Sequence, residues 1–349
     1  LILLLFLNLL VKPFWILGID RTVQNVVGAE EYGFYFAVFN FSFLFNILLD
    51  LGITNYNNRN IAQHHQLLNK HFSSIVIIKF LLAVLFSIIT FSAGIMIGFG
   101  PEQLKLLAFL CFNQFLLSFI LYLRSNVSGL LLFRTDSVLS VLDRLLMILI
   151  CGVLLWGHVT SSPFKIEWFV YAQTAAYSLT AITAMIIVIK KAAFRRLNWN
   201  WPFFVMIIKQ SFPFAILALL MTFYNRIDSV MIESLLPGSL GDSEAGIYAS
   251  AYRLLDASHM IAYLFSVLLL PLFARMIKQR QPVVQVVRLA FTLLIILSSI
   301  IAFGSYFYSY ELMDLMYLEH VPESAAVFRL LMLGFMAIST TYIFGTLLT

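Results

Sequence analysis

Long apolar runs separated by short polar connectors make up most of this chain. Ten such runs can be marked in order, at 1–19, 33–54, 73–98, 104–124, 138–157, 167–189, 205–232, 247–273, 288–309 and 325–349. A helix of roughly 20 apolar residues crosses about 30 Å of hydrocarbon. The pattern therefore predicts an all-α polytopic membrane protein with about ten transmembrane helices.

A connector motif occurs twice along the chain. The pattern G-x-x-E-x-G-x-Y occupies residues 28–35 and again 241–248, an offset of 213 residues (241 minus 28). Apolar runs that follow the first copy land on apolar runs when they are shifted by the same offset. We interpret this as an internal repeat. Residues 1–189 are expected to form a six-helix lobe, and residues 205–349 the first four helices of a second, truncated lobe.

The segment between the two repeat units is basic and rich in tryptophan. It carries Lys190, Lys191, Arg195, Arg196, Trp199 and Trp201. Such a composition suits the anionic inner leaflet and its headgroup region. We therefore predict that residues 190–204 form an inter-lobe linker on the cytoplasmic face.

Cations gather on one side of the predicted membrane. If residue 1 lies toward the cytoplasm, the inner connectors carry Arg59, Lys70, Arg124, Arg134, Lys190, Lys191, Arg195, Arg196, Arg275, Lys278, Arg280 and Arg288. The outer connectors then carry only Arg21, Lys105 and Lys165, whereas acidic residues, Asp20 among them, fall mostly outside. Because cytoplasmic connectors are enriched in Lys and Arg, this is the predicted orientation.

Composition excludes a soluble protein and a nucleic-acid partner. Hydrophobic residues make up 61% of the chain and charged residues 11%, whereas a soluble domain needs far more charge on its surface. The net charge of +5 is explained by the surplus of inner-connector cations. The expected environment is the lipid bilayer.

Sequence signatures of catalysis and of metal binding are missing. The chain has no G-x-x-x-x-G-K-[ST], no H-E-x-x-H and no C-x-x-C pattern, and every predicted connector is short. His64, His65 and His71 have no cysteine or carboxylate nearby to complete a ligand set. We predict no catalytic residue, no metal site and no enzymatic activity, which leaves a transporter built from repeats.

Two neighbouring predicted spans carry charges of both signs. Arg226 and Asp228 lie in span 205–232, and Arg253 and Asp256 lie in span 247–273. Each charge would cost a few kcal/mol if it faced lipid. Two interpretations stay open: these residues line a polar cavity, or they form an inter-helix salt-bridge cluster that fixes packing.

Further polar positions fall in the first three spans. Ser42, Asn46 and Asp50 are spaced to share one helix face, where they either bind a ligand or join helices. Lys12 and Lys79 lie inside spans 1–19 and 73–98. Each either extends along the helix toward the membrane interface or faces a cavity.

Several segments together resemble a known family. Gly28-x-x-Glu-x-Gly33-x-Tyr35, the run from Asp50 to Tyr56, Asp228, and the run from Gly246 to Leu254 are similar to the polysaccharide transporter family of flippases, in the multidrug/oligosaccharidyl-lipid/polysaccharide superfamily. The resemblance implies two pseudo-twofold related helical lobes around a central cavity. It implies a monomer in a bacterial or archaeal plasma membrane that works with other polysaccharide assembly proteins.

The resemblance also implies a cargo. An oligosaccharide on undecaprenyl pyrophosphate would move from the cytoplasmic to the periplasmic leaflet for O-antigen, capsule or exopolysaccharide synthesis. Arginine pairs with phosphate oxygens in a bidentate manner, so Arg226, Arg253 and Lys12 are the candidate pyrophosphate contacts. Asp228, Asp256 and Asp50 would hold these cations in place, or take part in proton or sodium coupling; no other cofactor is expected.

Three alternatives are weighed against this function. A multidrug exporter of the same superfamily would bind cations through buried acids in the first lobe, but span 1–19 offers Lys12 and no carboxylate. A lipid II flippase differs only in cargo. A membrane glycan polymerase, which is an enzyme, would carry a large extramembrane loop that the spacing of the spans leaves no room for.

Overall fold

The computed structural model describes residues 2–54, 57–58, 61, 66–157, 164–191, 201–236 and 239–348. This part of the chain contains eleven α-helices. Six of them are long and apolar enough to cross a membrane: His71–Ile97, Pro101–Gly129, Phe133–Trp156, Ile166–Lys191, Val284–Phe307 and Val321–Gly345. The all-α expectation is confirmed.

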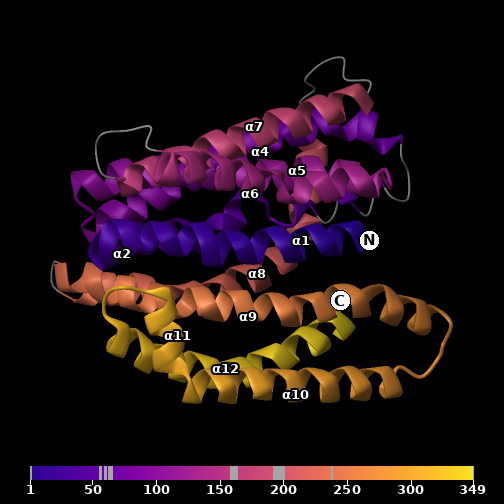
Figure 1. Ribbon diagram of the computed structural model, residues 1–349. Helices are drawn as coiled ribbons and strands as arrows, with labels where there is room; N and C mark the ends of the chain where they lie inside the picture. Colours follow the sequence, from indigo (N-terminus) through magenta and orange to yellow (C-terminus); the bar gives the residue numbers. More distant parts are fainter. Residues whose placement is uncertain are drawn as a thin grey trace.

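The long helices run side by side in two groups (Figure 1). Lobe one consists of α1 (Ile2–Phe14), the π-helix η1 (Trp15–Asp20), α2 (Arg21–Leu44), the 3₁₀ turn η2 (Asn46–Leu49), α4 (Leu67–Ile97), α5 (Pro101–Gly129), α6 (Phe133–Trp156) and α7 (Ile166–Lys191). Lobe two consists of α8 (Trp201–Leu235), α9 (Ser239–Lys278), α10 (Val284–Phe307), α11 (Ser309–Met316) and α12 (Val321–Leu348). Helix α2 packs along α8 and α9 and so joins the lobes.

The predicted boundaries of the lobes fall partly outside the described residues. Residues 192–200 of the expected linker belong there, as do Asn55, Tyr56, Arg59, His64 and His65. The exposed Lys190 and Lys191 form the end of α7. The linker and its cytoplasmic placement therefore stay predictions.

The expectation that the first span ends before an outer connector at Asp20 is wrong. The chain stays helical from α1 through η1 into α2, and the backbone breaks only at Gly28, where φ is 87°. Asp20 is 2% exposed. The helix can continue through this polar stretch because Gln24 and Asn25 donate hydrogen bonds to carbonyl groups of lobe two instead of to water.

The second span is also shorter than the apolar pattern suggests. Helix α2 ends at Leu44, the 3₁₀ turn η2 follows, and Leu51 and Gly52 have positive φ angles of 46° and 78°. Asn46 and Asp50 therefore do not continue the helical face of Ser42, so the predicted polar stripe is wrong. Instead, Asn46 donates a hydrogen bond to Gln114 across 2.8 Å.

The two copies of the repeated motif meet each other at the centre of the interface. A Cβ atom on Gly33 would lie 1.8 Å from the carbonyl oxygen of Asp242, and one on Gly246 would lie 2.0 Å from that of Ala29. In the repeat, Ala29 corresponds to Asp242 and Gly33 corresponds to Gly246, because each pair is separated by the offset of 213 residues. The contact is therefore reciprocal, as a pseudo-twofold axis requires. Glycine allows the backbones of α2 and α9 to approach this closely.

We predict that Gly33→Ala or Gly246→Ala forces α2 and α9 apart. Overpacking of this kind costs about 1–3 kcal/mol, and here the clash is with backbone that no rotamer change relieves. Melting temperature in detergent should fall for both variants. Gly334→Ala in α12 is the matched control, because its Cβ would meet nothing within 4 Å. An unchanged melting temperature in both interface variants would contradict the reciprocal contact.

Candidate functional site

Arg253 of α9 crosses from lobe two to lobe one. Its Nε lies 2.7 Å from Oδ2 of the buried Asp20 and donates a hydrogen bond of 3.2 Å to the hydroxyl of Tyr32. The guanidinium group also lies 5.1 Å from the ring centroid of Phe36. A buried carboxylate and the negative face of an aromatic ring both stabilise the cation, so this arginine is fixed at the lobe interface.

Arg226 of α8 makes a second cross-lobe contact beside it. Its Nη1 donates a hydrogen bond of 3.4 Å to Oδ1 of Asn40 in α2. Its guanidinium carbon lies 5.3 Å from the ring of Phe43 and 5.2 Å from that of Tyr252. The cation therefore sits between one aromatic ring from each lobe.

Asp256 connects the two arginines. Its Oδ2 lies 3.9 Å from Nη1 of Arg226 and 4.0 Å from Nη1 of Arg253. Asp20, Arg253, Asp256 and Arg226 thus form a row of alternating charge between the lobes, which we call the charge row. Two positive and two negative charges balance within it, so no member is buried without a partner.

Asp228 lies at the edge of the charge row. It accepts a hydrogen bond of 3.1 Å from the hydroxyl of Tyr248, and the two side chains border a narrow space together with Arg226. The space has no room for a water-sized molecule. In this conformation, Arg226 is therefore packed against protein groups on this side.

Lys12 is placed apart from the charge row. It lies on α1, which packs along α6, and the charges that act on it belong to Arg144, Asp143 and Arg124. Arg144 in turn lies 3.6 Å from Asp143 and between the rings of Trp15 and Tyr177, at 5.4 and 5.9 Å. Lys12 and Arg144 form a second cationic position within lobe one.

Asp50, which was predicted to hold the cavity cations or to take part in coupling, pairs with a different cation in the structure, and its part in coupling stays a prediction. Asp50 forms an ion pair with Lys79 inside lobe one. Lys79 is 1% exposed and also donates to Ser118 and to the carbonyl of Leu49, so it does not extend to the membrane interface. Because α2 unwinds before Asp50, the carboxylate turns into lobe one and away from the charge row.

Sequence reasoning missed Asp20, the buried partner of Arg253. Hydropathy alone assigns an aspartate at the end of an apolar run to a connector. The available signal was the spacing of Asp20 and Gln24, which places two polar residues one helical turn apart on the same face. Asp20 is the last residue of η1, which continues the first helix. The first lobe therefore contains a buried acid, and the lack of a carboxylate in span 1–19 no longer argues against an exporter.

Comparison with known proteins places the chain in a family. A sequence family described as "Polysaccharide biosynthesis protein" matches residues 17–277. The chain belongs to this polysaccharide biosynthesis protein family. The charge row lies within the matched region. No curated protein matches the chain.

The fold of this polysaccharide biosynthesis protein is that of MATE transporters. One solved structure, titled an inward-facing multidrug resistance MATE family transporter of the MOP superfamily, aligns with a TM-score of 0.67 at 12% identity, covering 98% of this chain and 85% of the other. The eukaryotic MATE transporter AtDTX14 aligns with a TM-score of 0.65 at 16% identity, covering 99% and 81%. The chain is therefore a multi-pass membrane protein with a transporter-like family and fold, consistent with a non-enzymatic protein.

We predict that Asp20→Asn and Arg253→Gln each destabilise the protein more than the double variant does. Removing one partner of a buried ion pair leaves an uncompensated charge and costs about 3–5 kcal/mol. In Asp20→Asn/Arg253→Gln no such charge remains at the pair. A double-mutant cycle of melting temperatures in detergent measures the coupling, and additive effects would contradict the ion pair.

For Asp50 we predict a structural effect only. Asp50→Asn removes the charge partner of Lys79 and should lower the melting temperature and the amount of protein in the membrane. Transport per folded molecule should stay within about twofold of the wild type, because Asp50 does not contact the charge row. A transport defect without loss of stability would contradict this prediction and would indicate that Asp50 acts at the cargo site.

Proposed function

We propose that this protein is a flippase for undecaprenyl-pyrophosphate-linked oligosaccharide. It moves the cargo from the cytoplasmic to the periplasmic leaflet by alternating access, for O-antigen, capsule or exopolysaccharide synthesis. The polysaccharide biosynthesis family and the transporter fold support this function. The observation that carries it is the pair Arg226 and Arg253, held between the two lobes with both side chains largely buried.

The two arginines match the chemistry of a pyrophosphate group. A phosphate anion that leaves water needs charged donors to replace its hydration, and guanidinium groups supply paired N–H donors. Arg253 is held by Asp20 of the opposite lobe. A phosphate group that enters the charge row can replace Asp20 as the partner of Arg253, so cargo binding and release of this contact favour each other.

Charge compensation within lobe two would be kept during this exchange. Asp256 lies on the same helix as Arg253 and stays within reach of both arginines when the lobes move apart. We propose that Asp256, together with the neighbouring Asp228, positions the cations and is the place where proton or sodium coupling acts. Lys12, beside Arg144, would contact the anion at a second position on lobe one.

An exporter of organic cations is the second candidate, because the buried Asp20 supplies the acid that such a protein needs. A lipid II flippase is the third and shares the cationic site. The glycan function is preferred because the family match is to polysaccharide biosynthesis proteins. Deleting the full-length gene in its native host distinguishes them. Loss of surface polysaccharide with accumulation of its lipid-linked precursor supports the proposal, whereas raised sensitivity to cationic drugs alone favours the exporter.

We predict that Arg226→Ala, and Arg253→Ala combined with Asp20→Asn to leave no unpaired buried charge, abolish surface glycan per molecule of protein in the membrane. Each loss removes a donor that the anion needs, and we expect export to fall at least tenfold. Arg288→Ala, an exposed cation on α10, is the matched control and should export normally. Surface glycan should be quantified against protein level by immunoblot; normal export by both variants would overturn the cation site.

A further inference from the structure

Each lobe sends a short turn toward the other. In lobe two it is the last residue of α11, Met316, with the non-helical residues 317–320 before α12, and in lobe one it is the start of α5 with Gln103. Gln103 and Met316 are equivalent in the repeat, since 103 plus 213 is 316. The two turns therefore stand on opposite sides of the reciprocal crossing of Gly33 and Gly246.

The turn between α11 and α12 is bonded densely to lobe one. Arg21 donates to the carbonyls of Leu315 (2.9 Å) and Met316, and Asn25 donates to Met316 across 2.9 Å. Glu319 accepts a hydrogen bond of 3.2 Å from the backbone N–H of Ala29, the first donor after the break at Gly28. We call this set of contacts the latch.

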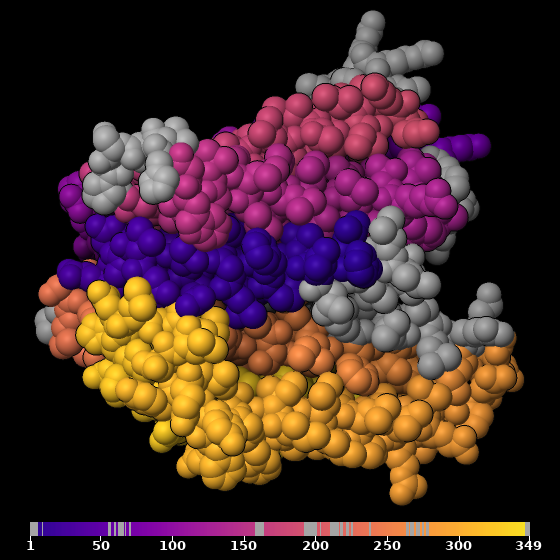
Figure 2. Space-filling model, viewed as in Figure 1, coloured from indigo at the N-terminus to yellow at the C-terminus, as the bar shows by residue number. Residues whose placement is uncertain are grey.

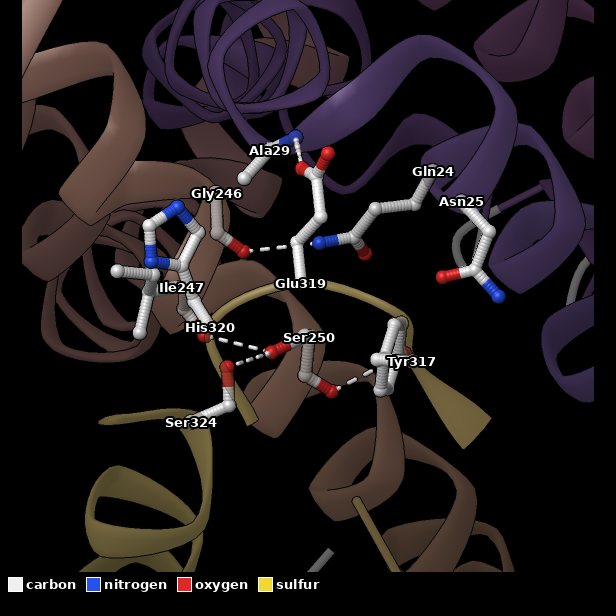
Figure 3. A pocket seen from close by; sticks show the side chains of 10 residues that line it. All are labelled: Gln24, Asn25, Ala29, Gly246, Ile247, Ser250, Tyr317, Glu319, His320 and Ser324. Atoms are coloured by element: carbon white, nitrogen blue, oxygen red, sulfur yellow. Dashed lines mark hydrogen bonds between the residues drawn. The ribbon is translucent and has the colours of Figure 1, made fainter. Parts of the chain in front are cut away.

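Figure 3 shows Asn25, Ala29 and Glu319 of the latch together with the residues around them. Gln24 donates a hydrogen bond of 3.0 Å to the carbonyl of Gly246. Behind it, Ser250 bonds to Ser324 across 2.9 Å and its carbonyl accepts from Tyr317. The space left between these residues is only about 10 Å³, no more than one water molecule needs. Figure 2 shows the same continuity, with indigo and yellow atoms in contact at this end.

The opposite side of the crossing is loosely joined. Among the described residues, Nε2 of Gln103 donates a hydrogen bond of 2.6 Å to Oε1 of Glu233 there, and farther along α8 Arg226 donates one of 3.4 Å to Asn40. Beside the bond between Gln103 and Glu233 lies a cavity of about 680 Å³, within the size range of ligand sites. Its wall includes two aromatic rings, three carboxylates and one amide, from Phe34, Phe99, Glu102, Glu233, Asp242 and Gln103.

From this asymmetry we infer that the lobes separate on the Gln103–Glu233 side, while the latch stays closed and acts as the hinge. The cavity on the opening side is then the exit vestibule for the glycan part of the cargo. The inference rests on the proposed function. Among the described residues, the latch side carries a dense set of hydrogen bonds, whereas the other side carries fewer bonds beside a preformed space. This difference favours rotation about the dense side.

The wall of the vestibule suits sugars better than phosphate. Carboxylates and an amide accept and donate hydrogen bonds to hydroxyl groups, and aromatic faces attract the weakly positive C–H edges of a sugar ring. None of the described residues that line this cavity is a lysine or an arginine. A pyrophosphate group would therefore be repelled toward the arginines of the charge row, while the glycan could enter.

Burial acts on two of these acids, which lie between the predicted spans 205–232 and 247–273. Desolvation raises the pKa of Glu233 and that of Asp242, and the charge of Glu30 raises the pKa of Asp242 further. Their ionised forms are therefore less stable in the closed arrangement than in water. Opening on this side would return both carboxylates to water and remove this cost, so burial of the two acids weakens the closed arrangement on this side.

Reversible cross-linking of the two sides tests the hinge. Full-length protein carrying Gln103→Cys/Glu233→Cys is compared with Asn25→Cys/Met316→Cys, each treated with a short bis-methanethiosulfonate linker and assayed for flipping of lipid-linked oligosaccharide in proteoliposomes. The link at 103–233 should reduce flipping more than tenfold, with recovery on reduction. The link at 25–316 should leave at least half of the activity.

Three outcomes would overturn the inference: the 25–316 link alone stops flipping, both links stop it equally, or neither does. Absence of flipping by the wild type in the same vesicles would instead count against the proposed function. If a cysteine variant does not fold, spin-label distances at exposed Leu240 and Ile97 in a cysteine-substituted background report opening directly. The inference requires this distance to widen on cargo addition more than a second distance measured across the latch.

Discussion

The close crossing of α2 and α9 is the constraint on which the rest of the structure depends. Gly33 and Gly246 let each helix press against the backbone of the other, and any side chain there would separate the lobes. This approach brings Tyr32 and Asn40 of α2 within reach of Arg253 and Arg226. The charge row exists because the backbones meet without side chains between them.

The charge row shows how charges are accommodated inside a membrane protein. Asp20, Arg253, Asp256 and Arg226 alternate in sign, and aromatic rings cover the guanidinium groups. Balanced charge makes the closed state tolerable, although the desolvation of ion pairs leaves little net stabilisation. A marginal pair at the interface between the lobes suits the proposed function, in which an anionic cargo takes the place of one of its partners.

The two sides of the crossing differ although the sequence repeat relates them. The turn at Met316 is bonded by Arg21, Asn25 and the backbone of Ala29, whereas Gln103 meets Glu233 beside an open cavity. Repeated architecture therefore supplies two equivalent contacts, and divergence of side chains has made one of them strong. A pseudo-symmetric protein can acquire a directional movement in this way.

The apolar runs by themselves determined the helical class, the order of the long helices and the internal repeat, because hydrophobic length and the G-x-x-E-x-G-x-Y motif are local properties. They also drew attention to Arg226 and Arg253, since charge within an apolar run is visible in one dimension. Only the tertiary structure decided which charged side chains pair with one another. Asp20 looked like a connector residue and Asp50 like a cavity acid, yet helix continuation through η1 buries the first and unwinding before Asp50 turns the second toward Lys79. Which groups meet depends on backbone breaks and interhelical distances that hydropathy does not encode.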